Sequence, residues 1–286
     1  MPLDWGRDGA RWPNRELSRF VTTRGVRWHV QRGGAGPRVL LLHGAGAATH
    51  TWRGLIPLLL PDFEVLAPDL PGQGFSSGAA PRFTLPGMAQ DVAALLAEQG
   101  FAPDLVVGHS AGAAIALRLA LAGGATPRAA IALNGALTPF RGVAGALFPP
   151  LAKLLSLNPL SGALFARTAA APGAVRGLLE ATGSAIDPEG LRLYERLITT
   201  SSHVSATLAM MARWNLEPLI ADLPRLAIPV TLALGLRDRA VPPAETRAAA
   251  RRIPQARIVE YPDLGHLMHE EAPDRIAALI RETAAA

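Results

Sequence analysis

The chain contains no cysteine, which excludes disulfide scaffolds, iron–sulfur proteins, thiolate zinc sites and cysteine nucleophiles. It also lacks a long uncharged apolar run. The longest stretch without Asp, Glu, Lys or Arg is Leu197–Ala212, whose 16 residues include seven Ser, Thr and His side chains, so we expect no transmembrane segment. The first residues include Asp4, Arg7 and Asp8 with no apolar run behind them. We therefore expect no secretory signal and a cytoplasmic protein.

Lysine is almost absent, although the formal net charge is +5 and the sequence pI is about 10.8. Lys153 is the single lysine among 28 basic residues, and the arginines are scattered, with no run longer than Arg251–Arg252. Binding to nucleic acid needs positive charge clustered along one face. The pattern therefore predicts no nucleic-acid partner, while an acidic partner or an anionic membrane face stays compatible with the charge.

The 286 residues, 49% of them hydrophobic, are enough to bury a core. Short apolar runs bounded by turns alternate with segments of helical periodicity, which predicts an α/β fold with a mostly parallel central sheet flanked by helices. The predicted strands are Ser18–Val21, Gly25–Gln31, Arg38–Leu42, Glu64–Ala67, Leu105–Val107, Ala129–Leu133, Val230–Leu234 and Arg257–Tyr261. The predicted helices between and after them are Leu85–Gln99, Ala113–Leu121, Ala244–Arg252 and Pro273–Thr283.

The interval from residue 137 to residue 226 interrupts this alternation, because it contains several prolines and no convincing strand. Its apolar segments instead have helical spacing. They are Leu147–Leu157, Val175–Leu179, Leu191–Ile198 and Leu208–Trp214. We therefore expect a core formed by residues 1–136 and 227–286, with residues 137–226 inserted as a helical cap.

A nucleophile motif follows the predicted strand Leu105–Val107. Residues Gly108-His109-Ser110-Ala111-Gly112 have the form G-x-S-x-G between a buried strand and a helix. A serine in such a tight turn has strained backbone angles, so its second neighbours on both sides must be small. The alternative is a glycine turn between core elements, but the strand-to-helix context favours Ser110 as a nucleophile.

A serine nucleophile requires a base and an acid that orients it. His266 follows the last predicted strand and is the preferred base, whereas His269 is expected to have a structural role or to lie at the rim. Asp238 is the carboxylate in the turn after the strand Val230–Leu234, where the acid is expected in chain order. The alternative role of Asp238 is to cap its turn beside a neighbouring arginine. Asp263 is not preferred as the orienting acid, because it lies too close to His266 along the chain.

The tetrahedral intermediate of acyl transfer requires two backbone N–H donors. We expect one from Ala111, the residue after the nucleophile, and one from Ala45 in the glycine turn His43–Gly46. No phosphate-binding glycine motif is present, so we expect no nucleotide cofactor. His266, His269 and Glu270 offer no further ligand at a recognisable spacing, so we expect no metal.

With these residues placed, the chain resembles the α/β-hydrolase family over nearly its whole length. The matching motifs are His43-Gly44, the segment 68–74 (PDLPGQG), the serine turn, the segment 235–243 and Gly265-His266. The resemblance implies the α/β-hydrolase fold, and Ser110 sets the chain apart from family branches with an aspartate nucleophile.

The first 31 residues have a narrower resemblance, to the magnesium-chelatase accessory proteins of bacteriochlorophyll biosynthesis. The matching residues are Asp4-Trp5, Asp8-Gly9, the segment 12–15 (WPNR), the segment 18–21 (SRFV) and the segment 27–31 (RWHVQ). This resemblance implies a partner in magnesium chelation or tetrapyrrole synthesis, without defining a reaction. The tryptophans are also explained by packing of this leader onto the core.

The predicted cap is unusually apolar, which is typical of a pocket for a bulky apolar small molecule. Phe148, Phe165, Met210 and Trp214 are the candidate lining residues, and packing within the cap itself is the alternative for each of them. The sequence therefore predicts a serine esterase-like hydrolase that acts on a bulky apolar ester, and the resemblance of the first 31 residues implies an association with bacteriochlorophyll biosynthesis. Two alternatives remain: a non-catalytic accessory or tetrapyrrole-binding protein that retains the triad, and a cofactor-free enzyme that forms peracids or hydrolyses C–C bonds.

Overall fold

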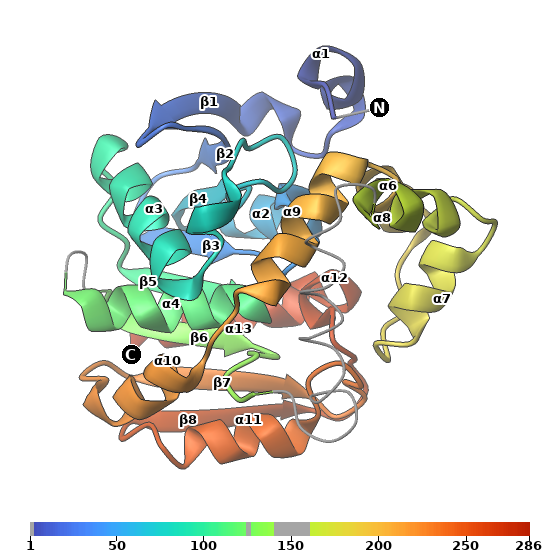
Figure 1. Cartoon of the computed structure of the whole chain (residues 1–286). Coiled ribbons are helices and arrows are strands. Elements are labelled where there is room, and N and C mark those ends of the chain that lie inside the picture. Colours follow the sequence, from blue (N-terminus) through green and yellow to red (C-terminus); the bar gives the residue numbers. More distant parts are fainter. Residues whose placement is uncertain (1–2, 124–126, 140–160) are drawn as a thin grey trace.

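The computed structural model describes residues 3–123, 127–139 and 161–286. Eight strands form one sheet in the order β1-β2-β4-β3-β5-β6-β7-β8 (Figure 1). The strands are β1 (Ser18–Thr23), β2 (Val26–Gly33), β3 (Arg38–Leu42), β4 (Glu64–Pro68), β5 (Leu105–His109), β6 (Ala129–Leu133), β7 (Val230–Gly235) and β8 (Ala256–Tyr261). Each lies within a few residues of a predicted strand, and the predicted α/β-hydrolase fold is confirmed.

The sheet is parallel from β4 to β8, and only β1 and β2 run antiparallel to their neighbours. The turn between β1 and β2 contains Arg24 and Gly25, both with positive φ, at 49° and 76°. Two such residues match the right-handed twist of a hairpin, which explains the tight turn there. The remaining strands need crossover helices, so their carboxyl ends meet at one edge of the sheet.

The two faces of the sheet each support a separate hydrophobic layer, as strand β3 illustrates. Leu40 and Leu42 pack into one buried cluster, while Val39 and Leu41 pack into the other. Successive side chains of a strand point to opposite faces, so a strand that is covered on both sides must be apolar throughout. This arrangement explains the continuous apolar runs in the sequence.

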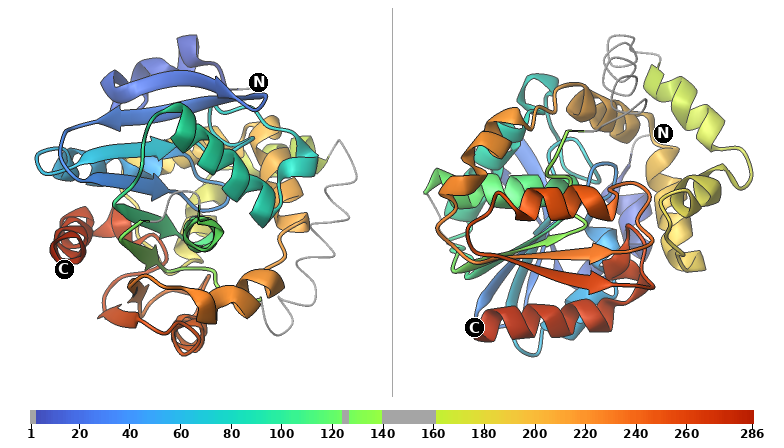
Figure 2. Two further views of the ribbon diagram at one scale, coloured as in Figure 1. Left: turned by 90° about the vertical axis from the view of Figure 1, so that its left-hand side faces the viewer. Right: turned by 90° about the horizontal axis from the view of Figure 1, so that it is seen from below.

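Helices cover both faces of this sheet. The first layer contains residues of α3 (Leu85–Glu98), α4 (Ala111–Ala122) and α11 (Pro243–Ala250). The second contains residues of α2 (Leu55–Leu59), α12 (Met268–Glu271) and α13 (Pro273–Ala285). The view from below in Figure 2 shows α11 and α13 on opposite sides of the strands.

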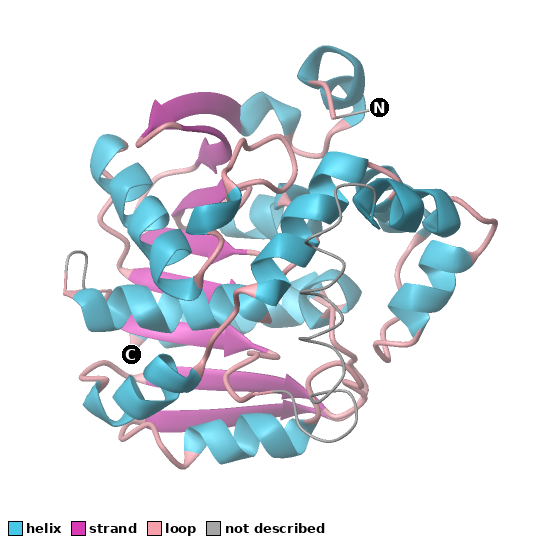
Figure 3. Ribbon diagram, in the orientation of Figure 1, coloured by secondary structure: helices cyan, strands magenta, loops and turns pink. Residues whose placement is uncertain are grey.

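Between β6 and β7 the described residues form helices, with no strand among them (Figure 3). They are α6 (Ser161–Ala169), α7 (Ala174–Glu180), α8 (Pro188–Ile198), α9 (Ser201–Ala212) and α10 (Glu217–Asp222). Helices α6, α7 and α8 lie beyond the arrowheads of the parallel strands in Figure 1. The helix expected at Leu147–Leu157 lies outside the described residues, and the limits 137 and 226 of the cap stay a prediction.

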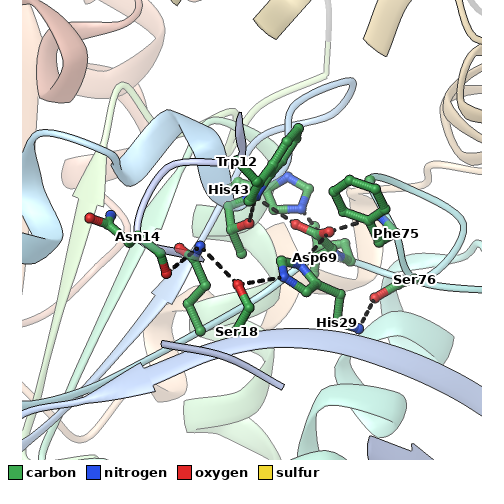
Figure 4. Close-up of polar contacts among 12 residues, drawn as sticks. Trp12, Asn14, Ser18, His29, His43, Asp69, Phe75 and Ser76 are labelled. Carbon is green, nitrogen blue, oxygen red and sulfur yellow. Dashed lines mark hydrogen bonds and ion pairs between the residues drawn. The ribbon is translucent and has the colours of Figure 1, made fainter. Parts of the chain in front are cut away.

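The N-terminal leader packs against the core through a buried polar and aromatic cluster (Figure 4). Trp12 donates from Nε1 to Thr49 Oγ1 at 2.9 Å, and its ring meets that of Phe75 edge-on at 4.8 Å. His29 Nδ1 lies 2.8 Å from Asp69 Oδ2, with both side chains fully buried. Burial alone would raise the pKa of Asp69, but His29 and the hydrogen bonds to the carboxylate lower it to about 2. Packing of the leader onto the core thus explains why a tryptophan occurs at position 12.

None of the helices in the described ranges combines the length and the apolar character that crossing a bilayer demands.

Candidate active site

Ser110 lies in the tight turn between β5 and α4, at the carboxyl edge of the sheet. Its backbone has φ 51° and ψ −117°, a region that costs a non-glycine residue on the order of 1–3 kcal/mol and is typical of functional sites. A Cβ atom on Gly108 would lie 2.4 Å from Gly112 O, and one on Gly112 would lie 2.2 Å from Leu42 O. Both contacts are too short for any side chain, so the two glycines permit the turn that presents Ser110.

Asp238 and His266 meet where the loops after β7 and β8 leave the sheet. His266 Nδ1 lies 2.8 Å from Asp238 Oδ2. The other carboxylate oxygen, Oδ1, accepts hydrogen bonds from the backbone N–H groups of Ala240 and Val241, at 2.8 Å each. Because an ionised carboxylate only accepts hydrogen bonds, this geometry assigns the imidazole proton to Nδ1 and leaves Nε2 able to accept one.

Ser110 and His266 line the same cavity, which has a volume of about 280 Å³. Ser110 reaches it from the end of β5, and His266 from the loop after β8. Asp238 stands behind His266 and is 4% exposed. The structure therefore brings together the three residues that the sequence predicted as nucleophile, base and acid.

The two competing side chains are placed elsewhere. Asp263 is half exposed and forms an ion pair with Arg275, at 2.7 Å between Oδ2 and Nη1. His269 is fully buried, with Nε2 2.7 Å from Thr51 Oγ1 and its ring against that of Trp52. Its surroundings are those of a core histidine, in agreement with the structural role considered for it.

The turn after β3 approaches the serine turn closely. A Cβ atom on Gly44 would lie 2.9 Å from His109 Nδ1 and 3.1 Å from Ser110 Cβ. Ala45 lines the cavity, and Ala111 is the first residue of α4. Within the described parts of the chain, the amide of Ala45, which lies in the turn after β3, donates to no backbone group, and the amide of Ala111 donates to none outside its own helix. Both N–H groups are thus available at the positions expected for oxyanion donors.

Asn134 joins three of these segments, and the sequence analysis did not identify it. It follows β6 directly, is 1% exposed and has a φ of 45°. Its Nδ2 donates to the carbonyl oxygens of Gly265 and His266 at 2.8 and 2.9 Å, and its Oδ1 accepts from the N–H of Gly235 at 2.8 Å. The side chain therefore fixes the start of the Asp238 loop and the backbone of His266. The only signal in the sequence was an Asn-Gly pair at the end of a strand.

Two further histidines beside the site are held in the neutral form. Burial lowers the pKa of His43, whose Nδ1 donates to Gly44 O at 2.8 Å while Nε2 accepts from the N–H of Leu70 at 2.9 Å. Burial also lowers the pKa of His109 well below its usual value, and its Nε2 donates to His266 O at 2.9 Å. These neutral rings add no net positive charge beside His266.

The cavity beyond Ser110 is lined mainly by apolar side chains from the helices between β6 and β7. These are Leu178 and Leu179 from α7, Tyr194 and Ile198 from α8, and Val204, Leu208 and Met211 from α9. Leu178 is 48% exposed, so its side chain has apolar surface that a ligand can cover. An apolar wall of this kind is suited to an acyl chain or another apolar group.

The predicted lining residues are placed differently. Phe148 and the side chain of Phe165 lie outside the described residues. Met210 is 1% exposed and Trp214 is half-buried, and both pack with the larger core cluster rather than along the cavity. Consecutive residues of a helix point about 100° apart, so α9 turns Met210 inward and presents Met211 to the cavity. The expectation for Met210 and Trp214 is therefore replaced by Met211.

Across residues 3–123, 127–139 and 161–286, no three His, Asp or Glu side chains gather closely enough to hold a metal ion. Glu270, adjacent to His269 in sequence, instead accepts hydrogen bonds from Tyr194 and Thr51 at 2.7 and 2.6 Å.

Comparison with known proteins agrees with the α/β fold described above. The model of the alpha/beta hydrolase family matches residues 39–279. Over 274 residues the chain is 44% identical to the magnesium-chelatase 30 kDa subunit of Rhodobacter capsulatus, and the match covers 95% of each chain.

Solved structures share the architecture. An alpha/beta hydrolase fold protein from Burkholderia ambifaria has a TM-score of 0.80 at 24% identity, over 93% of this chain and 97% of that one. The esterase EaEST from Exiguobacterium antarcticum has a TM-score of 0.77 at 19% identity, over 93% of this chain and 99% of that one. At these identities the likeness concerns the fold.

Proposed function

This chain belongs to the alpha/beta hydrolase family, and from that premise we propose that it is a serine hydrolase acting on an ester-like substrate with a bulky apolar group. The observation that carries the proposal is the Asp238–His266 pair, at 2.8 Å, beside a cavity that Ser110 and His266 both line. A base held by a carboxylate next to a strained serine is the arrangement that activates a hydroxyl for attack on a carbonyl.

In the proposed reaction, Ser110 Oγ attacks the substrate carbonyl carbon while His266 Nε2 takes the hydroxyl proton. Asp238 keeps the imidazole in the required tautomer and stabilises the imidazolium that forms. The N–H groups of Ala45 and Ala111 hold the negative oxygen of the tetrahedral intermediate. His266 then returns the proton to the leaving alcohol, which leaves an acyl group on Ser110. Water, activated by the same histidine, releases the acid and restores the serine.

The apolar lining of the cavity supports the substrate class, because an apolar group entering it is removed from water. Each Å² of apolar surface buried contributes about 25 cal/mol to binding. The 44% identity to a magnesium-chelatase subunit supports a partner in magnesium chelation. Together with the resemblance of the first 31 residues, it leads us to propose a place in bacteriochlorophyll biosynthesis, in the cytoplasm, with a chelatase or tetrapyrrole-pathway partner.

That same relative favours a second candidate, an accessory or tetrapyrrole-binding protein of magnesium chelation in which the triad is retained but not required. Its name describes a subunit of an enzyme complex rather than a hydrolase. The two candidates differ in whether the Ser110 hydroxyl is needed.

A fluorophosphonate probe tests the first candidate directly. We expect a single adduct on Ser110 by peptide mapping, with labelling that slows steeply in His266→Ala, since triad residues act as a unit. An adduct on another residue, or none, would contradict the assignment.

Complementation separates the two candidates. A pigment-deficient deletion strain that lacks the corresponding gene would be supplied with the wild-type chain or with Ser110→Ala. Rescue by the wild type alone supports catalysis in the pathway. Equal rescue by both would favour the accessory role.

A further inference from the structure

His203 is a buried residue of α9 that connects this helix to two loops of the core. Its Nε2 lies 3.0 Å from Gly46 O, and its Nδ1 lies 3.1 Å from the backbone nitrogen of Gly74. A carbonyl oxygen only accepts and a backbone N–H only donates, so Nε2 carries the proton and Nδ1 does not. One neutral imidazole therefore satisfies one group on each loop.

Gly46 is also held from its other side. Its N–H donates to Gln73 Oε1 at 2.7 Å, and Gln73 Nε2 contacts Met210 Sδ at 3.4 Å. Gly46 has a φ of 78°, a conformation that few residues other than glycine adopt, and it directly follows Ala45. Both backbone polar groups of Gly46 are thus hydrogen-bonded. Of their partners, His203 belongs to α9 and Gln73 contacts Met210 of α9.

The same helix forms one wall of the cavity. Val204, Leu208 and Met211 of α9 line it, and His203 itself reaches it. An apolar group that fills the cavity must therefore pack against the helix that holds the loop carrying Ala45. A displacement of about 1 Å in a catalytic group is enough to lower a rate by orders of magnitude, so the position of this loop matters for turnover.

We propose that His203 is a positioning residue that couples occupation of the apolar cavity to the oxyanion loop, so that a longer acyl chain raises kcat and not only affinity. The inference rests on the proposed hydrolase function. It states that the enzyme distinguishes acyl chains of different length through kcat. Substrate packing on α9 holds His203 against Gly46 O, and that contact fixes the direction of the Ala45 N–H.

Two substitutions separate the bonds of His203. The amide nitrogen of Gln reaches the position of His Nε2, so His203→Gln retains a donor for Gly46 O and loses the acceptor for Gly74. The amide oxygen of Asn reaches the position of Nδ1, so His203→Asn retains the acceptor and loses the donor. Ser202→Ala, an exposed position on the same helix, is the matched control.

The experiment measures kcat and KM on p-nitrophenyl acetate, butyrate and octanoate, with thermal unfolding of each variant. We expect kcat of the wild type to rise with acyl length. His203→Asn should lose about tenfold in kcat on octanoate and little on acetate, a smaller loss than the 10²–10³ seen on removing an oxyanion donor outright. KM should change less than threefold, and both His203→Gln and Ser202→Ala should stay within about threefold of the wild type in kcat.

Other patterns overturn the proposal. One such pattern is a rise in KM at unchanged kcat in His203→Asn. Another is an equal loss of kcat in His203→Asn and His203→Gln that occurs on every ester and parallels their loss of thermal stability. The second pattern would show that His203 has a structural role only. If His203→Asn does not fold, Met210→Leu, which conserves volume and breaks the Gln73 contact, should lower the octanoate-to-acetate ratio of kcat instead. A wild-type chain no more active than Ser110→Ala refutes the hydrolase function and this inference with it, whereas an active wild type without these effects refutes the inference alone.

Discussion

His266 and Asp238 are 28 residues apart in the chain, yet Nδ1 of the first lies 2.8 Å from Oδ2 of the second. The contact exists because β7 and β8 are adjacent parallel strands, so the loops at their carboxyl ends leave the sheet side by side. Asp238 receives two further hydrogen bonds from its own turn, which fix the carboxylate before it meets the ring. The imidazole of His266 is therefore oriented before any substrate binds.

The first prediction concerns this pair. Asp238→Asn should preserve the fold but favour the wrong tautomer of His266, and kcat on a good ester should fall by up to ~10⁴-fold. Asp263→Asn is the control, because Asp263 faces solvent and pairs with Arg275, and it should leave kcat within twofold. A loss below about tenfold in Asp238→Asn would exclude Asp238 as the orienting acid.

Asn134 provides the second prediction. Asn134→Ala leaves two carbonyl oxygens and one N–H without this partner, so the free energy of unfolding should fall by about 2–4 kcal/mol. Labelling of Ser110 by a fluorophosphonate should also slow, because the backbone of His266 loses its support.

Asn134→Gly separates the hydrogen bonds from the backbone conformation, since glycine adopts the observed φ of 45° without strain. Urea unfolding and labelling rates measure both effects. Normal labelling in Asn134→Gly would show that the side-chain hydrogen bonds do not position the base.

The third prediction tests the apolar cavity through Leu178, whose side chain lines it while remaining half exposed. Leu178→Ala removes surface that only a long substrate covers, so kcat/KM on octanoate should fall by about fivefold, the equivalent of roughly 1 kcal/mol, with acetate unchanged. Leu164, 64% exposed on α6 and outside the cavity lining, is the matched control. Parallel losses on short and long esters would mean that Leu178 supplies stability rather than selection.

The fourth prediction concerns acid stability. Burial lowers the pKa of His203 to about 4, whereas in the unfolded chain its pKa is near 6.5. Between these values the unfolded state binds one more proton, so the contribution of His203 to stability is complete above about pH 6.5 and declines as the pH falls toward 4. The free energy of unfolding should therefore decrease on acidification across this window.

His203→Gln removes that titration. The slope of unfolding free energy against pH should become shallower by up to ~1.4 kcal/mol per pH unit between pH 6 and 5, as urea unfolding at both values will show. An unchanged slope would mean that His203 is already accessible to protons in the folded chain.

The fold and the tight serine turn were predictable because their causes are local. Apolar runs such as Arg38–Leu42 predict strands buried on both faces, and the order of strands and helices then leaves few arrangements of the sheet. The segment Gly108–Gly112 was recognisable because only small residues fit around a serine with a strained backbone. The loops of Asp238 and His266 followed from the rule that strand ends meet at one edge.

Other expectations depended on which way a helix faces. Positions 210 and 211 are both methionine, and the sequence analysis favoured Met210 as the residue that lines the cavity. The packing of α9 places Met210 in the core and Met211 on the cavity. Periodicity indicates that a helix has an apolar face, but it does not indicate which of two apolar sides meets a ligand.

The sequence by itself determined the family, the sheet and the candidate nucleophile, base and acid, because each is encoded by residues within a few positions of a strand end. Only the tertiary structure decided the roles of Asn134 and His203, whose partners are distant in the chain. Asn134 bonds to residues 101 to 132 positions away, and His203 to residues 129 and 157 positions away. A single polar side chain has no periodicity or motif that names so distant a partner, and its function arises only when folding buries it between two loops whose polar groups must be satisfied.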